Sequence, residues 1–224
     1  MGSMSQTPRE PEIRAALRAY VAKEHAVEAH TLIVEELALC QSASRIDLVA
    51  VNGNLHGYEI KSARDTLQRL AGQAQAYRRV FDTVTLVLAG RHTAEARGMV
   101  PHWWGLVEVT GDRHRIQLRR KRKSRPNLCV DPRALVQFLW RSEALAILHE
   151  RHLDGGLRTK PKPALWNTLV RSLTTEQLRT CVREALKSRE RWRLGSRRAS
   201  GGGSCQRRAR SLHFQGPLRQ NRTG

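Results

Sequence analysis

The amino-acid sequence predicts an α/β fold (α+β in strict nomenclature): a mixed central β-sheet flanked by helices, with a basic C-terminal helical appendage. Helix-like and strand-like apolar patterns alternate along residues 10–120, which is typical of a sheet covered by helices. An Asn-Gly turn joins two apolar segments into a hairpin. The cationic excess lies in the second half of the chain, where helical apolar spacing continues.

The first elements surround this hairpin. Helices are expected over 12–23 and 26–39, where apolar residues recur at helical spacing. Residues 45–51 and 55–61 are expected to form paired strands. Residues 52–54, Asn-Gly-Asn, separate them, and an Asn-Gly step suits a tight turn that needs positive φ.

The next elements complete the sheet and its cover. Residues 66–81 carry Leu67, Leu70, Ala74 and Tyr77 at spacings of three and four, which predicts a helix. Residues 83–89 form a continuous apolar run before Gly90, as expected of a buried central strand. A helix over 93–99 and strands over 104–109 and 115–118 follow.

Composition divides the chain into three parts: a core over 10–120, a basic helical appendage over 121–193 and a disordered basic tail over 194–224. The appendage shows helical apolar spacing over 132–149, 164–172 and 175–188. The tail has little apolar content and includes a Gly-Gly-Gly-Ser tract, so it is not expected to bury a core.

The charge distribution indicates a polyanionic partner. The chain has 40 Lys and Arg residues against 20 Asp and Glu, a net charge of +20, yet residues 1–111 contain 12 of each kind. The excess therefore follows Gly111, and it includes the run Arg119, Arg120, Lys121, Arg122 and Lys123. We expect nucleic acid as partner, DNA in the first place, with this run contacting the phosphate backbone. A solvated loop or strand edge, or attraction to anionic lipid, is the alternative interpretation.

Cysteine usage and hydropathy indicate the compartment. No run of about 18 apolar residues is present, so no membrane span is expected. The four cysteines, at positions 40, 129, 181 and 205, form no CxxC pair. A reducing cytoplasm is therefore the expected location.

The hairpin also carries the residues that suggest chemistry. Asp47 lies within an apolar strand, where an unpaired carboxylate would be costly. Glu59 and Lys61 are two apart on the partner strand and therefore share a face, with Asp47 expected near Glu59 across the hairpin. Two carboxylates suit Mg²⁺ (or Mn²⁺), which lowers the pKa of a bound water and stabilises charge on a phosphate. The ammonium of Lys61 could act on that water or phosphate.

The pattern Asp47…Glu59-Ile60-Lys61 resembles the D…(D/E)xK motif of the PD-(D/E)XK nuclease superfamily, which includes restriction endonucleases and RecB-type exonucleases. The resemblance implies a restriction-endonuclease-like fold and metal-dependent hydrolysis of phosphodiester bonds. One departure is Ile46, which stands where the superfamily name has proline.

The same resemblance implies roles for flanking residues. Members place a glutamate on the helix before the motif strands, and Glu36 matches best as a third metal ligand, with Glu35 as the fallback. RecB-like members have a glutamine and a tyrosine on the helix after the lysine, here Gln73 and Tyr77. Gln73 is expected to position the lysine or the water, and Tyr77 is grouped with the nucleic-acid contacts. Both residues are as readily explained by structural roles.

A narrower likeness covers about residues 12–193. Five segments resemble a group of small bacterial proteins that are uncharacterised or described as nucleases of this fold: residues 45–47, 56–62, 64–67, 100–105 and 125–127. The group has no settled substrate. Within 100–105, Trp103 and Trp104 could stack on bases, or at least one of them could pack in the core.

The expected function is therefore a metal-dependent nuclease acting on DNA, with Asp47, Glu59, Lys61, Glu36 and Gln73 as catalytic residues. The alternatives are a non-catalytic nucleic-acid-binding protein on the same fold, an RNA-directed nuclease or toxin, and a protein–protein adaptor. The oligomeric state stays open, with a homodimer among the options.

Overall fold

The computed structural model of the protein describes residues 7–28, 30–39 and 44–199, and side chains as far as residue 189. Six strands form one sheet in sequential order. Their bounds are β1 Leu32–Leu39, β2 Ser44–Val51, β3 Leu55–Lys61, β4 Thr83–Ala89, β5 Gly105–Thr110 and β6 Gln117–Arg122. Strands β1, β2 and β3 are antiparallel neighbours, β3, β4 and β5 are parallel, and β6 returns antiparallel to β5. The predicted mixed sheet is confirmed.

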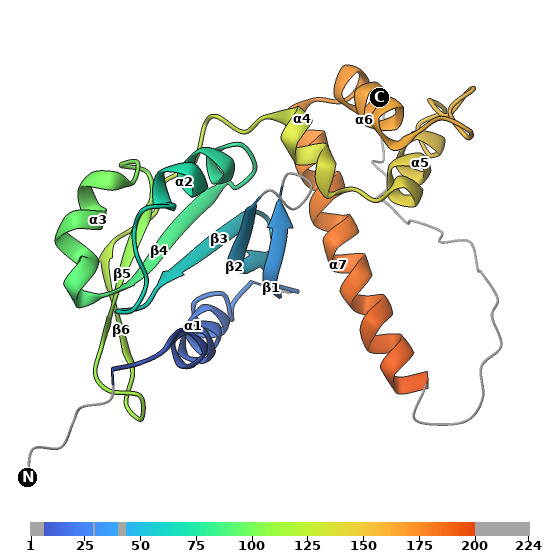
Figure 1. Cartoon of the computed structure of the whole chain (residues 1–224). Coiled ribbons are helices and arrows are strands. Elements are labelled where there is room, and N and C mark those ends of the chain that lie inside the picture. Colours follow the sequence, from blue (N-terminus) through green and yellow to red (C-terminus); the bar gives the residue numbers. More distant parts are fainter. Residues whose placement is uncertain (1–6, 29, 40–43, 200–224) are drawn as a thin grey trace, which may run out of the picture. The chain divides into compact units, whose positions relative to one another are not determined.

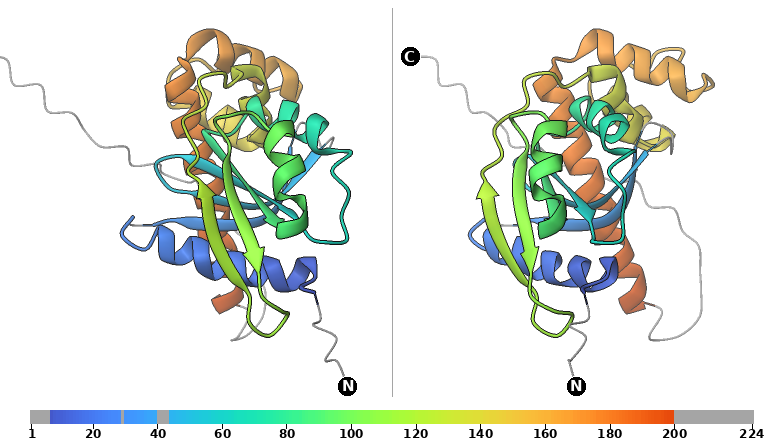
Figure 2. Two further views of the ribbon diagram at one scale, coloured as in Figure 1. Left: turned by 90° about the vertical axis from the view of Figure 1, so that its left-hand side faces the viewer. Right: turned by 60° about the vertical axis from the view of Figure 1, so that its left-hand side comes forward.

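Helices cover both faces of this sheet (Figures 1 and 2). Helix α1 (Glu10–Glu24) packs Ile13, Leu17 and Val21 against one face. Helices α2 (Leu70–Arg78) and α3 (Thr93–Met99) contribute to the hydrophobic cluster on the other face. The apolar stripe of each helix supplies the buried residues, as the periodicity predicts.

The chain after β6 continues as helices. These are α4 (Pro132–Leu135), the 3₁₀ turn η3 (Val136–Phe138), α5 (Arg141–His149), α6 (Lys162–Ser172) and α7 (Thr175–Ala199). Their buried side chains belong to the same hydrophobic cluster as the α2 face of the sheet. Polar contacts also link them to the end of α2 and the start of β4: Arg79 pairs with Asp131 at 2.8 Å, and Arg179 with Asp82 at 3.0 Å.

The predicted helix over 26–39 is wrong. Helix α1 ends at Glu24, and 32–39 form β1, which pairs along β2 from Leu32↔Val51 to Leu39↔Ser44. The segment 35–39 consists of good helix formers, so local propensity favours a helix. Pairing with β2 overrides that weak preference.

Other predictions differ at element boundaries. The helix expected over 66–81 is regular only over α2, and the one expected over 132–149 is divided, because Leu139 and Trp140 are extended. Glu143 accepts a hydrogen bond from the Trp140 amide at 2.7 Å and so caps the start of α5. Helix α7 continues to Ala199, into the predicted tail, and residues 200–224 lie outside the described residues.

The described helices include none that combines the length and apolar character needed to cross a bilayer. Cys129 and Cys181 are free thiols, the first exposed and the second buried. Cys40 and Cys205 lie outside the described residues.

Candidate functional site

Strands β2 and β3 separate at Asp47. Their pairing runs from Val51↔Leu55 to Leu48↔Tyr58 and ends there. Beyond that point the Asp47 carboxylate accepts a hydrogen bond from the Ile60 amide at 2.7 Å. A side chain thus takes the place of a strand carbonyl, which satisfies the amide while the two strands separate.

Strand β1 is irregular at the same level. Its pairing with β2 includes Glu35↔Leu48 and Leu37↔Ile46 but omits Glu36, whose φ is +51°. Ile46 and Val49, three apart on β2, nevertheless contribute to the same core cluster. Since strand residues alternate between faces, the backbone changes face around Asp47, as it does at a β-bulge.

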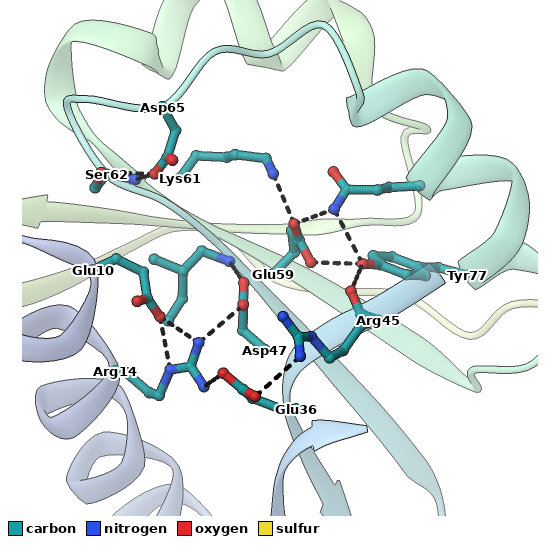
Figure 3. A network of polar contacts seen from close by, with 12 residues as sticks. Glu10, Arg14, Glu36, Arg45, Asp47, Glu59, Lys61, Ser62, Asp65 and Tyr77 are labelled. Atoms are coloured by element: carbon teal, nitrogen blue, oxygen red, sulfur yellow. Dashed lines mark hydrogen bonds and ion pairs between the residues drawn. The ribbon is translucent and has the colours of Figure 1, made fainter. Parts of the chain in front are cut away.

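The parting of the strands opens a cavity of about 1240 Å³. Asp47, Glu59, Lys61 and Gln73 all line it, from β2, β3 and α2, and Glu10 joins them from α1. Four arginines also line it: Arg45, Arg69, Arg78 and Arg79. Figure 3 shows these acidic side chains and Lys61 as parts of one polar network. The three hairpin residues singled out in the sequence therefore share one cavity.

Glu59 is almost completely buried, with 3% of its side chain exposed. Lys61 Nζ lies 2.8 Å from Glu59 Oε1, Gln73 Nε2 donates to the same oxygen at 2.5 Å, and the Tyr77 hydroxyl lies 2.6 Å from Oε2. The pair with Lys61 is thus a buried ion pair, not an exposed one on an edge strand. Such a pair tolerates burial because hydrogen bonds satisfy the remaining polar atoms.

Gln73 and Tyr77 both hold Glu59 in place. The Tyr77 hydroxyl also lies 2.9 Å from the carbonyl of Arg45, and its single proton can serve only one of these acceptors at a time. Burial raises the pKa of Tyr77, and the charge of Glu59 raises it further. The residue therefore acts as a neutral hydrogen-bond donor within the cavity wall.

The surroundings of Asp47 disfavour the charged form of its carboxyl group. Burial raises the pKa of its carboxyl to about 6, and the charge of Glu59 adds to the rise. The Ile60 amide and the Arg14 guanidinium, 3.3 Å away, act in the opposite direction. The two carboxylates are therefore close enough to repel each other across the cavity.

Arg14 on α1 gathers three carboxylates. It lies 2.5 Å from Glu10, 2.8 Å from Glu36 and 3.3 Å from Asp47. Glu36 also pairs with Arg45 at 3.3 Å, and its side chain is 48% exposed.

The assignment of Glu36 to a helix before the motif is wrong, because Glu36 lies on β1. Arg14 connects Glu36 to Asp47, and Glu36 is not among the described residues that line the cavity. The fallback, Glu35, pairs with Arg18 at 2.9 Å. Glu10, in the first turn of the preceding helix, does line the cavity, as does Asp65, whose carboxylate accepts hydrogen bonds from the amide and hydroxyl of Ser62.

Sequence reasoning missed Glu10 and the arginines of the cavity. Glu10 lies two residues before the first predicted helix, and the structure begins that helix at Glu10. Arg78 lies on α2 with Gln73, and Arg69 and Arg79 flank that helix.

The basic run lies at the β6 edge of the sheet, opposite the β1 edge. All its residues are described, and none lines the cavity. Arg120 pairs with Glu24 and with the Tyr20 hydroxyl, and Lys121 pairs with Glu108 at 2.8 Å. Residues 119–122 therefore lie on edge strand β6 and Lys123 follows it, and contact of this run with nucleic acid stays a prediction.

The two tryptophans differ in environment. Trp104 is fully buried and stacks on Tyr77, with 5.9 Å between ring centroids, whereas Trp103 is partly buried. The core interpretation is thus correct for Trp104.

Comparison with known proteins identifies the family. The sequence profile of the family "Bacteriophage P4 protein cII" matches residues 3–198, so the chain belongs to this family. Protein cII of Enterobacteria phage P4 is 30% identical over 147 residues, which is 66% of this chain and 55% of the phage protein. The matched part thus spans about half the length of that relative.

One solved structure is also similar. A protein of unknown function from Silicibacter pomeroyi aligns over 82% of this chain and 90% of its own, with 17% identity and a TM-score of 0.40. A likeness at this level carries no argument about function. The geometry and charges of the cavity are therefore the basis for a functional proposal.

The hydrogen bond between Asp47 and Ile60 yields a stability prediction. Asp47→Ala leaves the Ile60 amide without its acceptor and should lower the free energy of unfolding by about 1–3 kcal/mol. Asp47→Asn keeps a carbonyl oxygen for that amide and should be the more stable of the two variants. Urea denaturation of both variants checks this, and equal stability of the two would contradict it.

Proposed function

We propose that this protein is a metal-dependent nuclease that hydrolyses phosphodiester bonds of nucleic acid, DNA in the first place. One observation carries the proposal: Asp47 and Glu59 line the same cavity as the ammonium of Lys61, and the charge of Glu59 raises the pKa of Asp47. Two neighbouring acids beside an amine suit chemistry on a phosphate group.

The donor set of the cavity fits a hard divalent cation. Both candidate ligands are carboxylates, and a cation between them would relieve their repulsion. Among the described residues, no group of three or more His, Cys, Asp or Glu side chains forms a metal cluster. Mg²⁺ does not require one, because it is commonly held by one or two carboxylates and keeps several waters. A cavity of about 1240 Å³ has room for those waters.

Asp47 and Glu59 would hold Mg²⁺ or Mn²⁺. When bound, such an ion lowers the pKa of a coordinated water and offsets charge on the phosphate. Lys61 is placed to stabilise negative charge at the reacting group, because its ammonium projects into the same cavity. Gln73 and Tyr77 fix the orientation of Glu59, which makes them positioning residues.

Glu10 is the better candidate for the assisting acid first sought at Glu36. It lines the cavity, and its charge contributes to the raised pKa of Asp47. Glu36 is neutralised by Arg14 and Arg45. Both acids contact Arg14, so the difference between them lies in access to the cavity.

The arginines of the cavity support a phosphodiester substrate. Arg45 and Arg69 bring guanidinium groups to the same opening as the acids, from β2 and from the residue before α2. Guanidinium groups bind phosphate oxygens through charge-assisted hydrogen bonds. The net charge of +20 favours a polyanion over a neutral substrate.

The rival functions share the fold and differ in chemistry. A non-catalytic nucleic-acid-binding protein would use the cationic surface without a metal. An RNA-directed nuclease or toxin would use the same cavity on another substrate. An adaptor would need neither metal nor nucleic acid.

Cleavage assays separate these alternatives. Purified protein should cut labelled DNA in Mn²⁺ or Mg²⁺ and not in EDTA. Asp47→Asn, Glu59→Gln and Lys61→Met should each lower the rate by about 100-fold or more, since each removes charge at the reacting centre. Linear, circular, single-stranded and double-stranded DNA and an RNA of matched length form the substrate panel.

Glu95→Gln is the matched control, because Glu95 is an exposed glutamate on α3 that does not line the cavity. It should cut at the wild-type rate. Absence of metal-dependent cleavage of every substrate, or full activity of Asp47→Asn, would refute the proposal. Cleavage of RNA alone would transfer the same chemistry to the RNA-directed alternative.

The two glutamates bound to Arg14 can be ranked. Glu10→Gln should reduce the cleavage rate more than Glu36→Gln, by about tenfold, because only Glu10 lines the cavity. Both variants remove one carboxylate from Arg14, so the loss of that ion pair is matched between them. The reverse order of rates would return the assisting role to Glu36.

A further inference from the structure

A second cavity, of about 510 Å³, lies where β6 ends, at Arg122. Its lining consists of Arg97, His102, Arg122, Lys123, Ser124 and Arg125. Four of these residues are permanent cations, one is a histidine, and no carboxylate among the described residues lines the cavity. We call this the corner pocket.

The corner pocket is built by segments that are distant in the sequence. Arg97 comes from α3, His102 from the loop before β5, and the others from the end of β6 and the residues after it. The Arg125 amide donates to the carbonyl of Trp103 at 2.8 Å, which ties the two loops together. These loops contain the segments 100–105 and 125–127, whose likeness to small bacterial proteins the acidic cavity does not explain.

Gly105 allows the close approach of these loops. A Cβ at this position would lie 2.7 Å from Thr85 Oγ1 and 3.0 Å from the amide nitrogen of Ser124. A side chain here would therefore displace the backbone that carries Lys123 and Arg125.

Arg122 is held rigidly in the pocket wall. Its Nε donates to the carbonyl of Trp104 at 2.7 Å, and an Nη donates to that of Pro101 at 3.3 Å. Burial lowers the pKa of Arg122, and the charges of Arg97 and Arg125 lower it further. The fold thus keeps like charges together at one place, which is unfavourable unless an anion neutralises them.

The other cations of the pocket form no ion pairs within the described part of the chain. Arg97, Lys123 and Arg125 are exposed, and none has an ion-pair partner among the described residues. Arg120 and Lys121, which precede Arg122 on β6, in contrast pair with Glu24 and Glu108. The corner pocket thus contains the end of the basic run, where the acidic side chains that pair with Arg120 and Lys121 do not line the cavity.

We propose that the corner pocket binds phosphate groups of the nucleic-acid backbone, at a place separate from the acidic cavity. Arg122, held by two backbone carbonyls, forms the floor, and the exposed side chains of Arg97, Lys123 and Arg125 contact phosphate oxygens. In the sheet register, Arg122 is aligned with Leu106, Leu86 and Glu59 in turn. Three strand spacings of about 4.8 Å place its backbone about 14 Å from that of Glu59.

The choice of nucleic acid as ligand rests on the proposed function, but the site requires no metal. It contributes to affinity through charge, independently of base sequence. The corner pocket would thus hold the substrate backbone while the acidic cavity contacts the reacting phosphate.

The test is equilibrium binding of a fluorescein-labelled 20-base-pair DNA duplex in EDTA, where no cleavage occurs. The triple variant Arg97→Gln, Lys123→Gln, Arg125→Gln should bind at least about tenfold more weakly than wild type at 0.15 M salt. The slope of log affinity against log salt should fall by roughly 2–3, as expected for three lost phosphate contacts. Circular dichroism and urea denaturation confirm that the variant folds, which is expected because the three side chains are exposed.

The matched control is Arg115→Gln, Arg158→Gln, Arg171→Gln. These three arginines are also exposed and lie outside the corner pocket, and the net charge changes by the same amount. The control should bind within about threefold of wild type, since a general charge effect is small at this salt. An equal loss of affinity in both triple variants would overturn the proposal.

Two further arms identify the source of the phosphate. A thermal shift by inorganic phosphate that the pocket variant loses, with duplex binding unchanged, would overturn nucleic acid in favour of a small phosphate ligand. Loss of binding to phosphatidylserine vesicles alone would overturn it in favour of a membrane surface. Duplex binding in EDTA requires neither metal nor cleavage, so a failure of cleavage and a failure of this site are distinguishable.

Discussion

The hydrogen bond from the Ile60 amide to the Asp47 carboxylate is the interaction on which the acidic cavity depends. It ends the pairing of β2 with β3 after Leu48↔Tyr58 without leaving the strand amide unsatisfied. Glu59 and Lys61 line the cavity that lies where the two strands separate. The same carboxylate is one of the two proposed metal ligands. Asp47 therefore both marks the end of the strand pairing and supplies a proposed ligand.

The charged side chains of the site form two groups. Lys61 pairs with Glu59, whereas Arg14 is shared by three carboxylates, those of Asp47, Glu10 and Glu36. Both cations are on long side chains, whereas the carboxylates are held by backbone or ring donors such as Ile60 and Tyr77. A divalent cation arriving in the cavity would therefore meet carboxylates that are already held in place.

The sequence was informative where local pattern and tertiary structure agree. The Asn-Gly turn and the parity of Glu59 and Lys61 were enough to place both side chains on one face. The resemblance to RecB-like nucleases singled out Gln73 and Tyr77, and both contact Glu59. It was misleading at 32–39, where helix-forming residues become a strand because β2 offers a pairing edge. That error transferred the assisting acid from Glu10 to Glu36. The arrangement around Arg14 joins α1, β1 and β2, and no local pattern encodes such a contact.

Calorimetric titration of the full chain with Mn²⁺ tests the central claim most directly. If Asp47 and Glu59 form a cation site, wild type binds one ion per chain at the acidic cavity, and Asp47→Asn and Glu59→Gln each lose that binding while remaining folded. Glu95→Gln, at a residue that does not line the cavity, binds as wild type does. Binding that survives both substitutions, or wild-type protein that takes up no ion, would contradict the assignment of a metal-dependent site to this cavity.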